Sequence, residues 1–279
     1  MGGNCMIIDG HAHSCGDFHE ADRLVSILDG WGVDRVVLCP GLVNDSKNRS
    51  LPQLTKVFRK ADIMLFMNRL IRLAAALKKA GGGLAERNEL VYSLHQKYPD
   101  RILQFYWADP LSGNVMDELR KRYSEWHFKG IKLHQCISAF KAGSPVMREI
   151  ALFARENRLP VFIHLYSKRD VKEFIGLALE HPGTVFIVGH FIGMERFKKY
   201  SGGIKNVYFD ISPGVLVSDY RINEAIKAFG ADHVLLGSDT PYGTDNLKYN
   251  LDRIKRLKVS NEQKDLILGK NMQKILDIW

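Results

Sequence analysis

A short stretch near the N-terminus places two histidines two residues apart. It reads Ile7-Ile8-Asp9-Gly10-His11-Ala12-His13, with apolar residues before the pair. Because residues i and i+2 of a strand point to the same side, His11 and His13 can aim their imidazoles at one point. Converging imidazoles are part of many sites for divalent transition metals. The stretch therefore indicates a metal site, although two unrelated polar residues in a loop would leave the same pattern.

Residues of similar chemistry stand at the ends of later apolar runs. They are Lys132 and His134, then His164, His190 and Asp239. Each has an ordinary alternative: His164 as a hydrogen-bonded core histidine, His190 as a loop residue and Asp239 as a cap of a turn. Their shared position at the ends of apolar runs is hard to obtain by chance. We therefore predict that they meet in one site with His11 and His13.

The elements that must position these side chains are short, apolar and without polar alternation, as strands of a parallel sheet covered on both faces are. We expect strands at 6–13, 35–39, 102–107, 128–134, 161–164, 185–188, 207–211 and 234–239. Helical patterns separate them. Eight strands alternating with helices predict a (β/α)8 TIM barrel, whose active site lies at the C-terminal strand ends. A doubly wound open sheet is the alternative, but no Gly-x-Gly-x-x-Gly or phosphate-loop motif supports it.

The stretch after the second strand is longer than a usual strand-to-helix connection. We treat residues 44–86 as a helical insertion on the active-site side. Within it, residues 63–77 predict a strongly apolar helix, which the glycines at 81–83 break. The insertion could be a lid, a contact in a homodimer, or a helix that packs on the barrel. The packing helix is the simplest of the three interpretations.

Length and composition suit one large core. The chain has 279 residues, of which 46% are hydrophobic, so we expect residues 1–279 to form a single domain. No apolar run reaches the ~18 residues of a membrane span. The N-terminal residues lack a basic region followed by an apolar one, so we expect no signal peptide. The four cysteines form no Cys-x-x-Cys pair. A reducing cytoplasm without membrane association is the expected location.

The positive charge is concentrated in the insertion. Residues 44–85 contain nine lysines and arginines against two aspartates, a net charge of +7 out of +9 for the whole chain. A protein that binds nucleic acid through this segment is therefore an alternative function. That alternative depends on one helix, whose apolar face more plausibly packs. We expect no nucleic-acid partner and a small, anionic substrate instead.

The motifs as a set resemble the amidohydrolase superfamily, in the amidohydrolase-related branch that includes aminocarboxymuconate-semialdehyde decarboxylase. The resemblance is carried by Ile8-Asp9-Gly10-His11-Ala12-His13, Tyr98-Pro99-Asp100-Arg101, Gly130-Ile131-Lys132-Leu133-His134, Val161-Phe162-Ile163-His164, Gly189-His190 and residues 229–239. It implies a (β/α)8 barrel with one or two divalent metals. It also implies that His11, His13, His164 and Asp239 bind the metal, and that His190 activates water or moves a proton.

Lys132 has two interpretations within this resemblance. Some members of the superfamily bridge two metals with a carboxylated lysine on the fourth strand, and Lys132 could be that residue. It could instead stay cationic and bind the carboxylate of a substrate, which is the role we favour. Three imidazoles and one carboxylate suit one zinc ion per chain, and manganese, iron or cobalt could use the same ligands.

These residues predict a metal-dependent hydrolase. It would act on a small organic acid, lactone or amide through a metal-activated water, with Asp239 as the base. The alternative is a decarboxylase of an unsaturated or aromatic acid, with His190 as the proton donor. A third alternative is a barrel that has lost its activity, against which the full set of site residue types argues.

Overall fold

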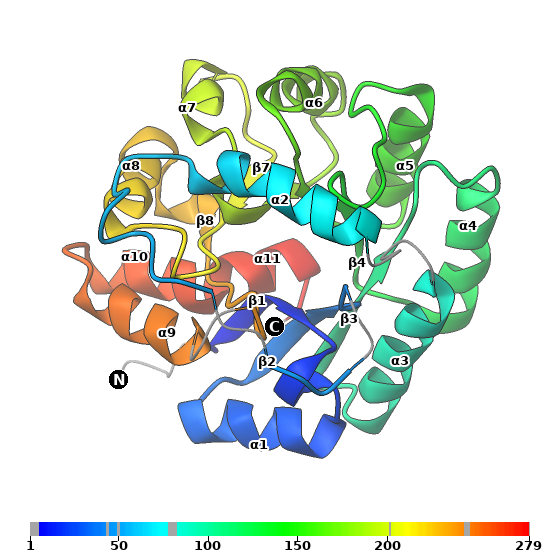
Figure 1. The fold of residues 1–279 in the computed structure, drawn as a ribbon, viewed down its shortest axis with the longest axis horizontal. Helices are drawn as coiled ribbons and strands as arrows, with labels where there is room; N and C mark the ends of the chain where they lie inside the picture. The colour runs from blue at the N-terminus through cyan, green and yellow to red at the C-terminus, as the bar shows by residue number, and fades with distance from the viewer. Residues whose placement is uncertain are drawn as a thin grey trace.

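The computed structural model describes residues 6–42, 45–48, 51–77, 83–200, 202–242 and 246–278. These residues form an eight-stranded parallel sheet in sequence order. The strands are β1 Ile8–His13, β2 Arg35–Cys39, β3 Ile102–Trp107, β4 Gly130–His134, β5 Val161–His164, β6 Phe186–Val188, β7 Val207–Asp210 and β8 Val234–Leu235. The predicted (β/α)8 barrel is confirmed, with helices arranged around the strands (Figure 1).

The barrel is closed between its first and last strands. The amide of Gly10 donates a hydrogen bond to the Leu236 carbonyl at 2.9 Å, and the His13 amide donates to the Thr240 carbonyl at 2.8 Å. Both bonds join the β1 segment to the chain that continues β8. Closure brings the C-terminal ends of all strands around one mouth, where barrel enzymes place their chemistry.

Helices connect the strands, and most of them cover the outside of the barrel (Figure 1). They are α1 Ala21–Trp31, α2 Ile63–Leu77, α3 Leu84–Lys97, α4 Val115–Trp126, α5 Pro145–Glu156, α6 Lys168–Glu180, α7 Met194–Phe197, α8 Asp219–Phe229, α9 Asn246–Arg256, α10 Asn261–Asp265 and α11 Asn271–Leu276. Short 3₁₀ or π turns complete the described chain: η1 Gly16–Phe18, η2 Gly189–Phe191, η3 Lys198–Tyr200, η4 Ala231–His233 and η5 Leu266–Lys270.

Local sequence sets the limits of these helices. α1 buries Leu24 and Leu28 on one face and ends at Gly32, whose φ of 65° suits the left-handed C-terminal position. α5 starts with Pro145 in its first turn, where the missing N–H costs nothing. Inside the barrel, Phe105 and Phe162 pack with Met272 of α11 in one buried cluster. The core therefore fills the barrel below the mouth.

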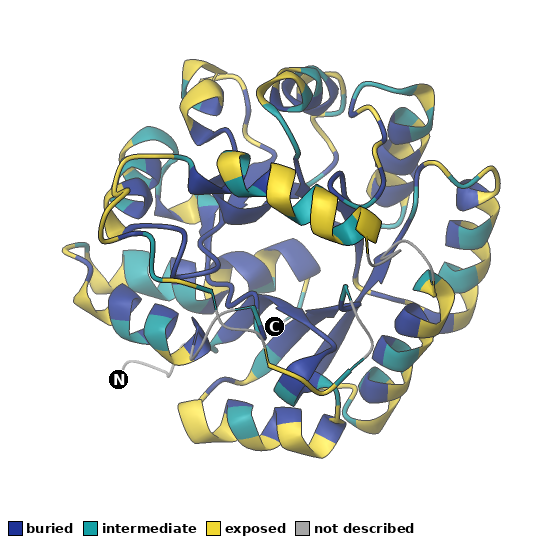
Figure 2. Cartoon of the chain, viewed as in Figure 1, coloured by how far each residue is buried: buried dark blue, intermediate teal, exposed yellow. Residues whose placement is uncertain are grey.

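The insertion contributes α2, which lies across the barrel mouth (Figure 1). Its inward side buries Met64 and Asn68. Much of the α2 ribbon is yellow, the colour of exposed residues, in Figure 2. Its outward side exposes four large apolar side chains: Phe66, Leu70, Leu73 and Leu77. The predicted helix thus covers the mouth of the barrel. Asn44, where the expected insertion begins, and the glycines at 81 and 82, two of the three expected to break its helix, lie outside the described residues.

In the described part of the chain, every helix is too short or too polar to cross a membrane.

Candidate active site

Three of the predicted ligands converge at the end of β1. Oδ1 of Asp239 lies 3.2 Å from Nε2 of His13 and 3.7 Å from Nε2 of His11. All three side chains are buried. Their donor atoms lie within 4.8 Å of one another, so one small cation could touch all three.

Hydrogen bonds on the far side of each ring fix which nitrogen is free. Nδ1 of His13 lies 2.8 Å from the Pro40 carbonyl oxygen, and Nδ1 of His11 lies 3.2 Å from Oδ2 of Asp210. A carbonyl oxygen only accepts, so Nδ1 of His13 carries the proton and Nε2 keeps its lone pair. The carboxylate of Asp210 has the same effect on His11. Both Nε2 lone pairs therefore point into the site, as in metal-binding histidines. That of His13 faces Asp239, and that of His11 lies between Asp239 and Nζ of Lys132.

His190 and His164 face the same cavity. His190 donates from Nδ1 to the Ser212 carbonyl at 2.7 Å, which leaves its Nε2 free. His164 is held in the opposite sense, with Nε2 bonded to Oδ1 of Asn68 at 2.7 Å. The ring centroids of His164 and His190 are 4.9 Å apart, and those of His11 and His190 are 5.4 Å apart.

Lys132 lies at the floor of the site. Its side chain is fully buried. Its Nζ lies 2.9 Å from Nε2 of His11 and 3.9 Å from the centre of the Phe162 ring. Burial lowers the pKa of the Lys132 ammonium. Burial, followed by the nearby Lys132, lowers the pKa of His11 well below its ordinary value. Burial is also the main cause of the lowered pKa of His13 and of His164. The ligand imidazoles are therefore neutral near pH 7, as metal binding requires.

Two predicted catalytic residues have strained backbones. His190 has a φ of 61° and Asp239 a φ of 58°, both in the left-handed region that disfavours residues with a Cβ. Such conformations persist where the surrounding structure holds them, and they concentrate at functional sites. This strain agrees with the placement of both residues at the barrel mouth.

Asp210 is a site residue that the sequence interpretation missed. It ends β7, and besides His11 its Oδ2 accepts a bond from the Ser212 hydroxyl at 2.5 Å. A Cβ at Gly237 would overlap the Asp210 carboxylate and lie tightly against His11, so glycine there permits their approach. An aspartate at the end of an apolar strand was the same signal that identified Asp239. Asn68 was also missed, and no pattern in the insertion marks it.

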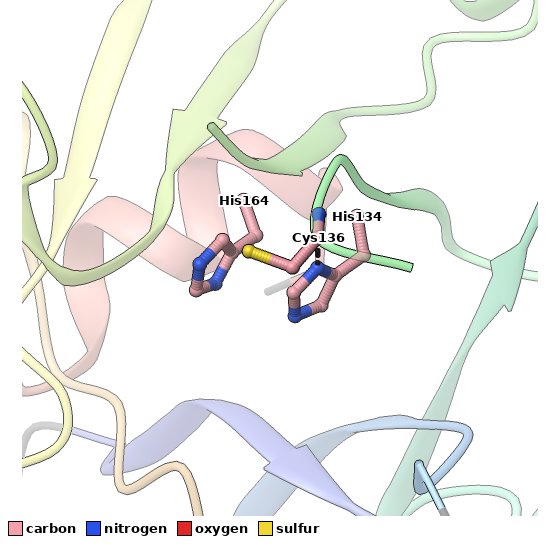
Figure 3. Close-up of side chains that lie close together, drawn as sticks. All are labelled: His134, Cys136 and His164. Carbon is pink, nitrogen blue, oxygen red and sulfur yellow. Dashed lines mark hydrogen bonds between the residues drawn. The ribbon is translucent and has the colours of Figure 1, made fainter. Parts of the chain in front are cut away.

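A third cluster combines His134, Cys136 and His164 (Figure 3). The two imidazole rings are stacked 4.0 Å apart with an angle of 9° between their planes. A metal binds in the plane of an imidazole ring, so two parallel rings at this distance cannot both aim a lone pair at one ion. Burial also raises the pKa of the Cys136 thiol to about 12, which disfavours the thiolate. As arranged, this cluster is a poor metal centre.

The donor atoms of His164 fall in this cluster and not in the group formed by His11, His13 and Asp239. The structure thus brings His164 to the same cavity but keeps it further from the other three ligands. Its place as the fourth ligand stays a prediction.

The cavity at the mouth has a polar floor and an apolar roof. Its volume is ≈ 120 Å³, and a cavity of ~150 Å³ is known to hold a benzene ring. The floor is formed by His13, Lys132, His134, His164, His190 and Asp239. The roof and walls are formed by Leu42, Leu51, Met64, Met67, Ile71, Leu216 and Tyr242. A compact molecule with one polar end and an apolar body fits this division.

Comparison with known proteins adds a family match. A family model described as Amidohydrolase matches residues 8–278. No curated protein matches the chain.

Three solved structures illustrate the structural similarity. The 2,6-dihydroxybenzoate decarboxylase from Rhizobium is 14% identical, with a TM-score of 0.68 and 98% of each chain covered. A dihydroxybenzoic acid decarboxylase from Polaromonas, with bound manganese and the inhibitor 2-nitroresorcinol, is 16% identical, with a TM-score of 0.64, covering 98% of this chain and 97% of that one. The 4-oxalomesaconate hydratase from Rhodopseudomonas palustris is 16% identical, with a TM-score of 0.64 and coverage of 98% and 96%. At these identities the similarity shows a common fold.

Proposed function

Because the chain belongs to the amidohydrolase family and is an enzyme of that type, we propose that it decarboxylates a small aromatic or unsaturated acid with the help of one divalent metal. The expected hydrolase and the alternative decarboxylase fit the family equally well. The observation that favours decarboxylation is the cavity, whose apolar roof over a polar floor suits a compact apolar body that carries one carboxylate.

We infer that His11, His13 and Asp239 hold the metal, with His164 as the fourth ligand. The support for this set is the hydrogen bonding of the rings, which leaves one nitrogen lone pair on each imidazole. Imidazole and carboxylate donors suit zinc, and they also suit manganese, iron or cobalt. When bound, the metal supplies positive charge that polarises an oxygen of the substrate or activates water.

Each group at the site would then have a separate role in the reaction. The apolar roof, including Met67 and Ile71, holds the ring and excludes water. Lys132 binds the carboxylate as a cation. His190 takes up a proton from water at Nε2, while Nδ1 keeps its own proton on the Ser212 carbonyl. It delivers the Nε2 proton to the ring carbon as the bond between that carbon and the carboxyl group breaks. The electron pair of that bond stays on the carbon, the new C–H bond forms there, and CO₂ leaves.

Hydrolysis of a lactone or amide is the second candidate. It is favoured by the position of Asp239, whose Oδ1 lies 3.2 Å from Nε2 of His13. A carboxylate at that point can accept the proton of an attacking water, with His190 as the donor to the leaving group.

A substrate screen on the zinc-loaded or manganese-loaded enzyme separates the two reactions. Single-ring hydroxybenzoates, unsaturated diacids, lactones and amides are incubated, and CO₂ and released acid are measured in parallel. We expect CO₂ from an aromatic or unsaturated acid, and its loss in His190→Ala. His233→Ala is the matched control, because His233 bonds the Val207 carbonyl at the start of β7, away from the mouth. Release of acid without CO₂ would favour hydrolysis in place of decarboxylation. The absence of both products would contradict both reactions.

We also propose a cytoplasmic location. It is supported by Cys39 and Cys136, which are buried free thiols.

A further inference from the structure

Asn68 connects the insertion helix to the end of β5. It lies in α2, its side chain is fully buried, and its Nδ2 group donates to the carbonyl oxygens of Leu165 at 2.8 Å and Tyr166 at 2.7 Å. Carbonyl oxygens accept and do not donate, so the amide nitrogen must face them. The side-chain oxygen of Asn68 is therefore turned the other way.

That oxygen faces His164. Oδ1 of Asn68 lies 2.7 Å from Nε2 of His164. Because an amide oxygen only accepts, Nε2 of His164 must carry the ring proton. The proton-free nitrogen is then Nδ1. In the alternative tautomer, the lone pair of Nε2 would face a lone pair of Oδ1 of Asn68, and neither buried atom would have a donor.

We propose that Asn68 is a positioning residue which fixes the tautomer and the orientation of His164 from the roof of the cavity. The position of α2 over the barrel mouth then determines whether Nδ1 of His164 can offer its lone pair to a cation. The tautomer part of this inference stands on the hydrogen bonds alone. The part concerning a cation rests on the proposed function, in which His164 is the fourth metal ligand.

A second anchor makes the role of Asn68 separable from the attachment of α2. Arg72, one turn further along the helix, donates from Nη2 to the Gln135 carbonyl at 2.7 Å. Its guanidinium also lies 3.2 Å from the centre of the Tyr166 ring. Gln135 in turn accepts a bond from the Tyr166 amide at 3.0 Å. The helix therefore stays fastened to the same loop when the Asn68 side chain is changed.

The tautomer can be measured without metal. We would record ¹⁵N spectra of the histidine rings in the metal-free full-length protein, and assign His164 from the signals lost in His164→Gln. The wild type should show protonated Nε2 and unprotonated Nδ1 at His164. Asn68→Leu should convert this ring to a mixture of tautomers. Asn68→Asp keeps an acceptor oxygen for Nε2 of His164 but loses both donated bonds to the carbonyls of Leu165 and Tyr166. It should therefore keep Nε2 of His164 protonated although it lowers thermal stability, a separation that a merely structural role would not give.

A matched control is Asn271→Leu. Asn271 is also buried, and its Nδ2 donates to the carbonyls of Ala231 and Val234 near the start of β8, far from any site histidine. This variant loses the same two donated bonds, so it should lower thermal stability as Asn68→Leu does. It should leave the His164 spectrum unchanged.

Zinc titration of the same proteins tests the second part. We expect the zinc affinity of Asn68→Leu to fall by ~10–100-fold, the usual effect of removing a partner of a ligating histidine, and that of Asn271→Leu to stay at the wild-type value. A single Nε2–H tautomer in Asn68→Leu would overturn the inference. A changed tautomer with unchanged zinc affinity would overturn its link to metal binding and remove His164 from the ligand set. A wild type that binds no zinc, manganese or cobalt would contradict the proposed function and leave the tautomer result valid.

Discussion

His11 and Asp210 are joined across the barrel mouth by a buried contact of 3.2 Å between Nδ1 and Oδ2. The two residues come from β1 and β7, which are not neighbours in the sheet. The same carboxylate oxygen lies 3.6 Å from Nδ1 of His190. One aspartate thus faces the rings of a predicted ligand and of the predicted proton donor.

Asp210→Asn should therefore weaken metal binding without removing a ligand. The neutral amide gives poorer support to the protonated Nδ1 of His11, and zinc affinity should fall by ~10–100-fold. Zinc titration against a chromogenic chelator measures the change. Asp232→Asn, at an exposed aspartate in η4, is the control, and an Asp210→Asn protein with wild-type affinity would contradict this role.

The metal content itself is a direct prediction. Purified wild-type protein should carry roughly one divalent transition metal ion per chain, as a single set of imidazole and carboxylate ligands implies. Elemental analysis should find the site empty in His11→Ala and in Asp239→Ala. His95→Ala is the control, because His95 bonds the Ile102 carbonyl at the start of β3. Full occupancy in the His11 and Asp239 variants would refute the ligand set, and two ions per chain would support a carboxylated Lys132.

The roof of the cavity should control substrate affinity and leave metal binding alone. Ile71→Trp adds bulk to a cavity of ≈ 120 Å³, and overfilled sites reject their ligands. For a single-ring acid we expect KM to rise at least tenfold while the metal content stays constant. Leu73→Trp is the matched control, since Leu73 on the same helix is 59% exposed on the outward side. Equal KM values for the two variants would show that α2 does not line the substrate site.

Two buried thiols should be unreactive in the native protein. Burial raises the pKa of Cys39 and of Cys136 to about 12. At pH 8 the thiolate fraction is then ~10⁻⁴, and only the thiolate is alkylated. Iodoacetamide labelling followed by peptide mass spectrometry should find both cysteines unmodified until urea is added. Rapid native alkylation of Cys136 would mean that the loop after β4 opens to solvent.

Most of the barrel could be predicted from the sequence, because its strands are short apolar runs that end at turn residues. The limits of β2, β3 and β5 agree with the expected ranges. β8 is shorter than expected: it covers Val234–Leu235 and not 234–239. The amides of Ser238 and Asp239 both donate to the His11 carbonyl, which bends the chain out of the strand toward β1.

The site was less predictable where it depends on partners distant in the sequence. Histidines at strand ends could be recognised from position alone. The contact between Asn68 and His164 depends on how an insertion folds over the mouth, and 96 residues separate the two. The single domain over residues 1–279, the homodimer and the absence of a nucleic-acid partner stay predictions.

The division of the cavity into floor and roof also bears on how such enzymes diversify. The floor is built from strand ends that the closed barrel holds in place, whereas Met64, Met67 and Ile71 come from one surface helix. Substitutions at these three apolar positions can accumulate without disturbing strand pairing or the ligand rings, provided that Asn68 of the same helix is kept. A lineage can therefore keep the inherited chemistry of the strand ends while it acquires a new choice of substrate through a single exchangeable segment.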